Sequence, residues 1–231
     1  MTNKQARSSA RGEGRVYGGL DPEQRKAMRR EQFLEAGLAV FGGEGFRSAT
    51  VRKLCREAKL TDRYFYESFA NLQELLTAVY ELHMGRIRER IYSSVMTCSA
   101  AEPPRTQVRL MLNAYFSALE DPRVARVCMV ELEGISPDVE QLYHGYILSF
   151  SELIVELASH VYPHWQLPDD ESLMLGMALV GAMRQPATHW LRSGYAMPRE
   201  TVVRAALRLV MGVIDSIEAD QGAAGAQCPL A

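Results

Sequence analysis

Apolar residues recur every three or four positions along most of the chain, which is the period of an α-helix. The stretches 139–161 and about 199–218 each carry one such apolar stripe. No stretch alternates apolar and polar residues as a half-buried strand would. Because proline interrupts a helix, the stripes belong to separate helices, and the sequence predicts an all-α fold. The interrupting prolines lie at 103–104, 121–122, 136–137, 163–168 and 197–198.

Cap residues divide the first third of the chain into three helices. Asp21 and Pro22 are typical of a helix start, and the glycine-rich stretch 42–45 should end that helix. Thr50 is predicted to cap a helix of about two turns, and Thr61 a third helix after a short break. The third helix should be anchored on the other two by two phenylalanines four positions apart, Phe65 and Phe69.

A fourth helix is predicted from about 72 to 96, opened by a capping box of Asn71 and Glu74. At that length it can reach from the N-terminal helices into the rest of the chain. A different pattern appears at 173–183, where 11 consecutive residues are apolar or glycine. A helix that is apolar all round must be covered on two sides, either by a partner subunit or as the central helix of a monomer.

The net charge of −2 conceals an asymmetry between the two ends of the chain. Residues 1–69 carry 14 lysines and arginines against 9 acidic residues, a net charge of +5, whereas residues 70–231 carry a net charge of −7. Residues 1–20 are rich in glycine, serine and arginine and are expected to form a disordered basic arm. A basic end indicates a polyanionic partner, although a solvated basic tail needs no partner at all.

Several classes of protein find little support in the sequence. The longest apolar run has 11 residues, short of the roughly 18 that a membrane span needs, and no secretory signal follows the basic N-terminus. We therefore expect a cytoplasmic protein. The four cysteines form no close pair, so neither structural zinc nor disulfides are expected. Glu156, His160 and His164 are spaced four apart, but Pro163 ends the helix before the last of them, so no metal site and no cofactor are predicted.

Residues 50–69 have the form of a helix-turn-helix, in which the second helix presents polar residues to the major groove of DNA. Arg63 lies almost opposite the anchoring phenylalanine on the helical wheel and can donate two hydrogen bonds to a guanine. Tyr66 and the Thr50 hydroxyl are better placed for phosphates. Asp62 can accept from cytosine or simply satisfy the helix dipole. The candidate DNA-binding residues are Thr50, Arg52, Thr61, Asp62, Arg63, Tyr64 and Tyr66.

A longer pattern surrounds this motif. It comprises Phe33-Leu34-Glu35-Ala36-Gly37-Leu38, Phe41, Gly45-Phe46, Thr50-Val51, Leu54, Glu57-Ala58, Leu60-Thr61, Phe65-Tyr66, Phe69, Leu75-Leu76 and Ala78-Val79. In this order and spacing, from Arg29 to about Val79, the chain resembles the DNA-binding domain of the tetracycline-repressor (TetR) family. Beyond that stretch only the all-helical plan, interrupted by prolines, agrees with the family. The chain departs from the family pattern at Lys59, usually Gly, at Arg63 and Tyr64, usually a small residue, and at Leu72, usually Lys.

The resemblance implies a ligand-responsive transcription regulator, most simply a repressor, which binds a pseudo-palindromic operator as a homodimer. It implies a helix-turn-helix domain over 21–70, a ligand-binding and dimerisation domain over 71–218, and leaves a flexible tail at 219–231. The helices at about 170–190 and 199–218 should form the dimer, and a small hydrophobic or acidic effector should shift the fourth helix. No enzymatic activity and no membrane partner are expected. The alternative is a helical enzyme or scaffold whose basic N-terminal domain binds an acidic protein.

A ligand cavity is expected among the middle helices of the C-terminal part, because aromatic and polar residues gather there on helix faces. Ordinary core packing would also explain the apolar candidates. Pro186 should kink its helix, as often happens beside a cavity, and an anionic ligand would suit Arg184. The polar candidates could instead form an exposed helix end. The candidates are Met111, Tyr115, Tyr143, Tyr146, Ile147, Phe150, Met177, Arg184, Gln185 and His189.

Overall fold

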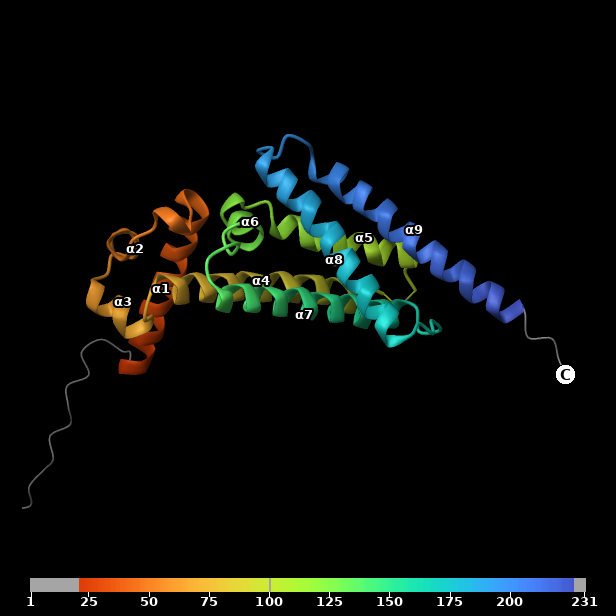
Figure 1. Ribbon diagram of the computed structural model, residues 1–231, viewed down its shortest axis with the longest axis horizontal. Coiled ribbons are helices and arrows are strands. Elements are labelled where there is room, and N and C mark those ends of the chain that lie inside the picture. The colour runs from red at the N-terminus through yellow and green to blue at the C-terminus, as the bar shows by residue number, and fades with distance from the viewer. Residues whose placement is uncertain (1–20, 100, 227–231) are drawn as a thin grey trace, which may run out of the picture.

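The computed structural model describes residues 21–99 and 101–226, and within them every regular element is a helix (Figure 1). This confirms the expected all-α class. The expected disordered arm at 1–20 lies outside the described residues. The elements are α1 (Pro22–Glu44), a 3₁₀ turn (Phe46–Ser48), α2 (Val51–Ala58), α3 (Asp62–Ser68), α4 (Leu72–Met96), α5 (Pro104–Ala118), α6 (Pro122–Met129), α7 (Pro137–Val161), α8 (Asp169–Arg192) and α9 (Arg199–Ala226).

The helix starts follow from the predicted caps. At the start of α1 the Asp21 carboxylate accepts from the Gln24 N–H at 2.8 Å, and the Gln24 side chain accepts from the Asp21 N–H at 3.0 Å. At the start of α2 the Thr50 hydroxyl accepts from the Lys53 N–H at 3.2 Å. These bonds satisfy N–H groups that the helix itself leaves unpaired, so the local sequence fixes where each helix begins.

The cap of α4 is built slightly differently from the predicted box. The Asn71 side chain accepts from the Glu74 N–H at 2.9 Å, as expected. The Glu74 carboxylate, however, accepts from the Ala70 N–H at 2.6 Å, one residue before the cap. The outcome for the fold is the same, since α4 starts at Leu72 and runs 25 residues to Met96.

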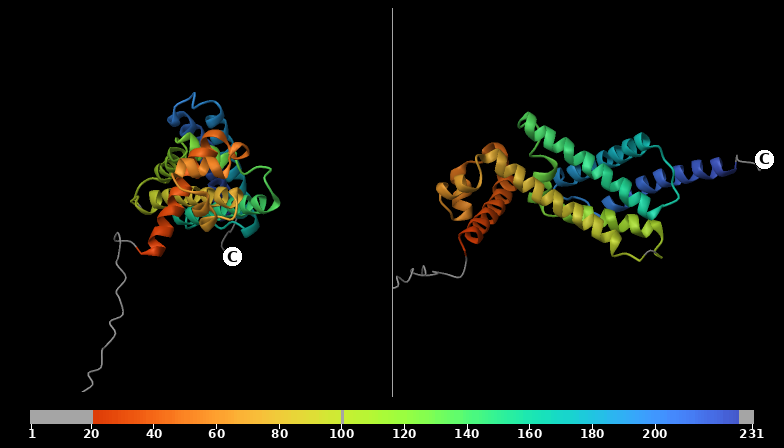
Figure 2. Two further views of the ribbon diagram at one scale, coloured as in Figure 1. Left: turned by 90° about the vertical axis from the view of Figure 1, so that its left-hand side faces the viewer. Right: turned by 90° about the horizontal axis from the view of Figure 1, so that it is seen from below.

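Helix α4 joins the two parts of the molecule. It starts beside α1, α2 and α3 and continues into the C-terminal helices, where α5 and α7 pack along it (Figures 1 and 2). Helix α8 lies on α7, and α9 lies on α5 and extends away from the N-terminal helices. No helix in the described part of the chain is long and apolar enough to cross a bilayer.

The C-terminal helix is longer than expected. Helix α9 continues to Ala226, through a stretch that the sequence analysis assigned to a flexible tail from 219. The stretch contains no proline before position 229, and alanine, the best helix former, recurs in it. Helix propensity therefore carries α9 past the end of its apolar stripe.

The C-terminal part is fastened to the N-terminal helices where α6 crosses the end of α1. A Cβ atom added at Gly42 of α1 would lie 2.5 Å from Arg123 Cβ and 2.6 Å from Arg123 Cα. The Arg126 guanidinium of α6 donates to the Gly43 carbonyl at 2.9 Å. Glu131, just after α6, accepts from the Phe46 N–H at 2.6 Å and from Arg126 at 2.6 Å. We call this contact between α1 and α6 the junction.

The junction predicts opposite effects for two adjacent glycines. Gly42→Ala should destabilise the protein by about 1–3 kcal/mol, because the new methyl group meets the backbone of α6. Gly43→Ala should be neutral or stabilising by up to about 0.5–1 kcal/mol, because a helical glycine is replaced where nothing lies within 4 Å. Urea unfolding of both variants measures the difference. Equal stability of the two would show that α6 does not press on α1.

Candidate nucleic-acid interface and ligand cavity

The N-terminal helices share a small aromatic core. The Phe33 ring of α1 lies edge-on to Phe65 at 5.5 Å and to Phe69 at 6.5 Å between ring centroids. All three side chains are buried. Aromatic contacts of this kind stabilise by roughly 0.5–1.5 kcal/mol beyond the area they bury. Helix α3 is only seven residues long, so this core, rather than its own hydrogen bonds, holds it in place.

The face of α3 opposite this core is open to solvent. The Arg63 side chain is 82% exposed and Tyr66 is 62% exposed. Thr61 is the cap of α3, but its hydroxyl makes no capping hydrogen bond. Six of the seven candidate DNA-binding residues lie exposed on this side of the two helices or at their starts: Thr50, Arg52, Thr61, Asp62, Arg63 and Tyr66.

Tyr64, the seventh candidate, has a different environment. It is half-buried, and the Arg29 guanidinium of α1 lies 4.5 Å from its ring centroid. Its ring therefore supports α3 against α1, and only part of it faces outward. Glu67 of α3 forms ion pairs with Arg63 on its own helix, at 3.0 Å, and with Arg29 on α1, at 3.7 Å. Exposed pairs of this kind contribute little, so Arg63 can exchange Glu67 for another acceptor.

The turn between α2 and α3 holds a lysine in an unusual backbone conformation. Lys59 has φ 55° and ψ 37°, the left-handed region, and its N–H closes α2 onto the Arg56 carbonyl. This region favours glycine, because a Cβ atom costs about 1–2 kcal/mol there. The turn keeps the geometry that a glycine would give it, and the strain stays local.

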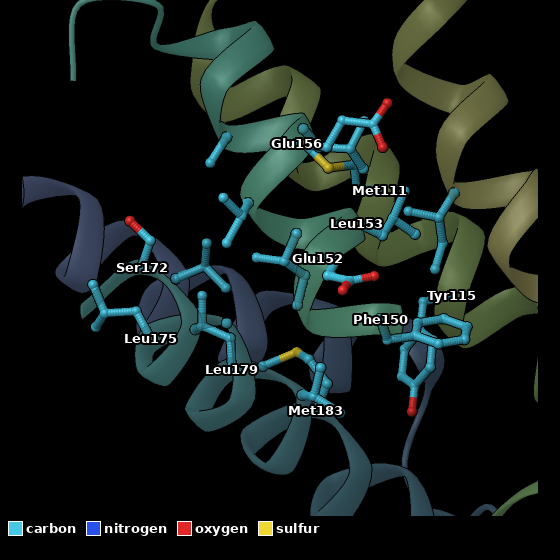
Figure 3. A pocket seen from close by; sticks show the side chains of 18 of the residues that line it. Met111, Tyr115, Phe150, Glu152, Leu153, Glu156, Ser172, Leu175, Leu179 and Met183 are labelled. Carbon is cyan, nitrogen blue, oxygen red and sulfur yellow. The ribbon is translucent and has the colours of Figure 1, made fainter. Parts of the chain in front are cut away.

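A cavity of 660 Å³ lies in the C-terminal part, bounded by α4, α5, α7, α8 and α9. Its walls are mainly apolar: Leu175, Leu179 and Met183 follow one another along α8, facing side chains of α7 and α5 (Figure 3). The volume is in the usual range for small-molecule sites. Seven of the ten candidate ligand residues line this cavity: Met111, Tyr115, Tyr143, Tyr146, Ile147, Phe150 and Arg184.

The other three candidates lie elsewhere. Met177 and Gln185 do not line the cavity, and His189 lines a separate small groove between α8 and α9. Helix α8 is well fitted to α7 at Gly176, where an added Cβ would lie 2.9 Å from the Ser151 carbonyl oxygen. Neighbouring positions on a helix point about 100° apart, so Met177 and Gln185 turn away from the face that this contact aims at α7.

Arg184 is already engaged by other parts of the chain. Its guanidinium donates to the Met129 carbonyl at 2.8 Å and to Glu133 at 2.7 Å, and it lies 5.0 Å from the centroid of the Tyr143 ring. Its Nε atom is buried and has no hydrogen-bond partner among the described residues. Glu133 balances its charge, so Arg184 is a weaker anchor for an anionic ligand than the sequence indicated.

The cavity also contains a residue that sequence reasoning missed. Tyr80 of α4 is 1% exposed, and its ring lies edge-on to Tyr146 at 5.1 Å. No hydrogen bond of its hydroxyl to the described residues is found, and the hydroxyl is not among the fully buried atoms without a partner, so it opens onto the cavity. Burial raises the pKa of Tyr80 and of Tyr115 well above the usual range, so both remain neutral donors. The sequence held no signal for this role, because Tyr80 is an isolated tyrosine on the predicted helix from about 72 to 96.

A short exposed helix on a three-helix core, joined to a helical domain with an apolar cavity, defines a helix-turn-helix regulator. Residues 33–79 match the model of the bacterial regulatory proteins of the tetR family. The match assigns the helix-turn-helix part of the chain to this family of transcriptional regulators, with the DNA-binding role that the family implies. The resemblance found in the sequence is confirmed.

Similar proteins come from several bacteria. The fatty acid metabolism regulator protein of Bacillus subtilis is 18% identical over 185 residues, which cover 79% of this chain and 94% of that protein. Among solved structures, the fatty acid degradation regulator FadR from Bacillus halodurans has a TM-score of 0.67 at 20% identity, over 80% of this chain and 95% of that one. FadR from Bacillus subtilis in complex with stearoyl-CoA has a TM-score of 0.66 at 16% identity, over 78% and 96%. At these identities the structural likeness establishes the fold.

Replacing Lys59 by glycine should stabilise the protein. The relief of left-handed strain exceeds the entropy that glycine adds to the unfolded chain, so we expect a net gain of about 0.5–1 kcal/mol and a Tm higher by about 2 °C. Glu57→Gly, at an exposed position inside α2, is the matched control and should destabilise by about 1 kcal/mol. Thermal unfolding followed by circular dichroism compares them, and a loss of stability in Lys59→Gly would contradict the strain.

Proposed function

We propose that this regulator is a ligand-responsive repressor that binds a pseudo-palindromic operator as a homodimer and is released by a small, mainly hydrophobic effector. The observation that carries the proposal is the combination of an exposed recognition helix with a 660 Å³ apolar cavity in the domain fastened to it. In this proposal Arg63 reads a base, while Thr50, Arg52, Thr61 and Tyr66 contact phosphates. Asp62 and Tyr64 support the helix start and its packing, with their outer atoms near the DNA.

A homodimer accounts for the apolar face left open on α8 and α9. Met174 is 56% exposed, Leu209 48% and Leu173 36%, although each is large and apolar. Large apolar side chains left exposed on two neighbouring helices are typical of subunit interfaces. Pairing this face with its symmetry copy would cover the all-apolar stretch of α8 on its second side. Two recognition helices would then meet successive major grooves about 34–36 Å apart.

A chain of contacts supports coupling between the cavity and the recognition helix. Arg184 lines the cavity and holds the Met129 carbonyl at the end of α6 and Glu133 just beyond it. Between those two positions, Glu131 holds the Phe46 N–H at the end of α1. A ligand that draws Arg184 away from α6 would therefore loosen the junction. The ligand needs to favour the loosened state by about 1–3 kcal/mol, the usual size of such coupling.

The cavity favours a chain-like apolar effector. Its walls are leucine, isoleucine, valine and methionine over most of their length. The related Bacillus subtilis regulator was solved with stearoyl-CoA, and by that likeness we propose a long-chain acyl compound as the effector class here. An acidic effector held by Arg184 is less well supported, because Glu133 already neutralises that guanidinium. Met111, Tyr115, Tyr143, Tyr146, Ile147 and Phe150 are the proposed contacts.

Loss of the Arg63 guanidinium should weaken and broaden DNA recognition. We expect Arg63→Ala to lose about 1–3 kcal/mol of discrimination at one base pair in each half-site, because a bidentate contact to guanine disappears. Selection from a random duplex library followed by gel-shift titration measures it, and the selected sites should contain two inverted half-sites one helical turn apart.

The matched control for that experiment is Arg109→Ala. Arg109 is exposed on α5, away from the helix-turn-helix. Its substitution therefore removes the same charge as Arg63→Ala without removing a contact to a base. The repressor proposal fails if wild-type protein selects no sequence at all. The role of Arg63 in reading a base is wrong if Arg109→Ala and Arg63→Ala lose the same discrimination between base pairs.

Weakening the hydrogen bonds of Glu131 should let the junction open to solvent more often. In Glu131→Gln the charge-assisted bonds to Phe46 and Arg126 become weaker, by about 1.5 kcal/mol or more. We expect the Phe46 amide to exchange with solvent about tenfold faster or more, and the Lys53 amide in the α2 cap to keep its rate. Hydrogen exchange read by mass spectrometry or NMR measures both, with Glu102→Gln as the exposed control. An unchanged Phe46 rate would remove Glu131 from the coupling path.

A further inference from the structure

The two ends of the cavity differ in chemistry. The end nearest α6 gathers phenols from three helices: Tyr80 of α4, Tyr115 of α5, and Tyr143 and Tyr146 of α7. The other end lies between the second half of α7 and the start of α8 and is lined by acids. We call these ends the phenol end and the acidic rim.

The hydroxyl groups at the phenol end have few hydrogen-bond partners in the protein. Tyr80 is buried, and no hydrogen bond of its hydroxyl is found among the described residues. The Tyr115 hydroxyl has only the Met129 sulfur, a weak acceptor, at 3.8 Å. A donor that faces an apolar cavity without a good acceptor gains a hydrogen bond when a ligand oxygen lies beside it, so a ligand with an oxygen at this end is favoured.

The acidic rim repels anions. Glu152 and Glu156 of α7 and Asp169 of α8 line the cavity and are exposed, and Asp170 and Glu171 follow in the first turn of α8. Among the described lining residues Arg184 is the only lysine or arginine, and it is paired with Glu133 at the opposite end. The described lining residues therefore offer no lysine or arginine at the rim to pair with a phosphate group.

Helix α9 adds a further carboxylate, that of Glu218, beside the acidic rim. The Glu218 carboxylate accepts hydrogen bonds from the indole N–H of Trp165, which lines the cavity, and from His164 at 3.0 Å. The Trp165 bond is the largest cause that holds the pKa of Glu218 below its usual value, ahead of the hydrogen bond and the charge of His164. Glu218 therefore adds another negative charge beside the opening at neutral pH.

We propose that the effector is an uncharged long-chain lipid whose carbonyl or hydroxyl oxygen is bound at the phenol end, and that CoA thioesters are disfavoured. The proposal rests on the repressor function proposed above and narrows its effector class. The apolar walls take the chain, and Tyr80 and its neighbours donate to the head oxygen. A CoA thioester cannot hold its carbonyl at the phenol end and its CoA group at the acidic rim, because the two are directly bonded. With the chain reversed, its phosphate charges would lie beside the rim carboxylates, which oppose them.

Four probes with the same 12-carbon chain separate the possibilities. Full-length protein is titrated with methyl laurate, laurate, lauroyl-CoA and dodecyltrimethylammonium, and binding is read from the fluorescence of Trp165 and Trp190 and from thermal shift. We expect methyl laurate to bind at least about tenfold more tightly than lauroyl-CoA at low salt, with the gap narrowing as salt is added. Tightest binding of lauroyl-CoA, of laurate or of the cation, or no binding of methyl laurate, overturns the proposal.

Variants at each end give the reciprocal test. Tyr80→Phe should weaken methyl laurate binding about fivefold while folding is kept, because the hydroxyl has no protein partner to lose. Tyr92→Phe, exposed on the same helix, is the control and should change nothing. Glu152→Gln with Glu156→Gln should strengthen lauroyl-CoA binding several-fold and leave methyl laurate unchanged. Unchanged ester binding in Tyr80→Phe, or unchanged CoA binding in the rim variant, counts against the proposal.

The two proposals fail in different ways. Binding is measured on the protein without DNA, whereas the repressor function is measured by operator retention. If methyl laurate binds as expected but leaves the protein on its operator, the lipid site stands and ligand-controlled release does not. If lauroyl-CoA binds most tightly and releases the operator, release stands and the effector class proposed here is wrong.

Discussion

The contact between α1 and α6 is the constraint on which the rest of the structure depends. At Gly42 the two helices approach so closely that a methyl group would strike the Arg123 backbone. Around that point Arg126 and Glu131 tie α6 to the Gly43 carbonyl and the Phe46 amide. A recognition helix of seven residues needs such support, because it is positioned entirely by its neighbours. The aromatic core fixes α3 on α1, and the junction fixes α1 on the domain that contains the cavity.

Much of this arrangement could be predicted from local sequence. The caps at Asp21, Thr50 and Asn71 place helix starts within a few residues, since a cap bond joins positions only three apart. The left-handed conformation of Lys59 was not predicted, although its place where the family usually has glycine marked the turn as unusual. The candidate DNA-binding face was predictable, because helical period alone sets Arg63 opposite Phe65.

Long-range partners could not be predicted in this way. Arg184 is an attractive anion anchor in the sequence, but its partners Met129 and Glu133 lie more than 50 positions away in the chain. Tyr64 was expected to face DNA, yet an arginine from α1 covers its ring. Tyr80 escaped notice because a single tyrosine on a helix has no periodic signal of its own. In each case the side chain's role is set by residues from other helices, and a single sequence contains no record of those pairs.

Arg184 links the ligand cavity to the helix that supports the helix-turn-helix domain. The same guanidinium borders the phenol end, where Tyr143 lies against it, and binds the carbonyl that ends α6. Its buried Nε atom has no partner among the described residues, so a head oxygen arriving beside the phenols can draw the guanidinium toward the ligand and away from the Met129 carbonyl. Any shift of Arg184 toward the ligand weakens its hold on α6, and α6 is the element that presses on α1. A ligand at the phenol end can therefore act on the junction through α6 as well as on α4 through Tyr80, because the polar end of the cavity and the support of the recognition helix share Arg184.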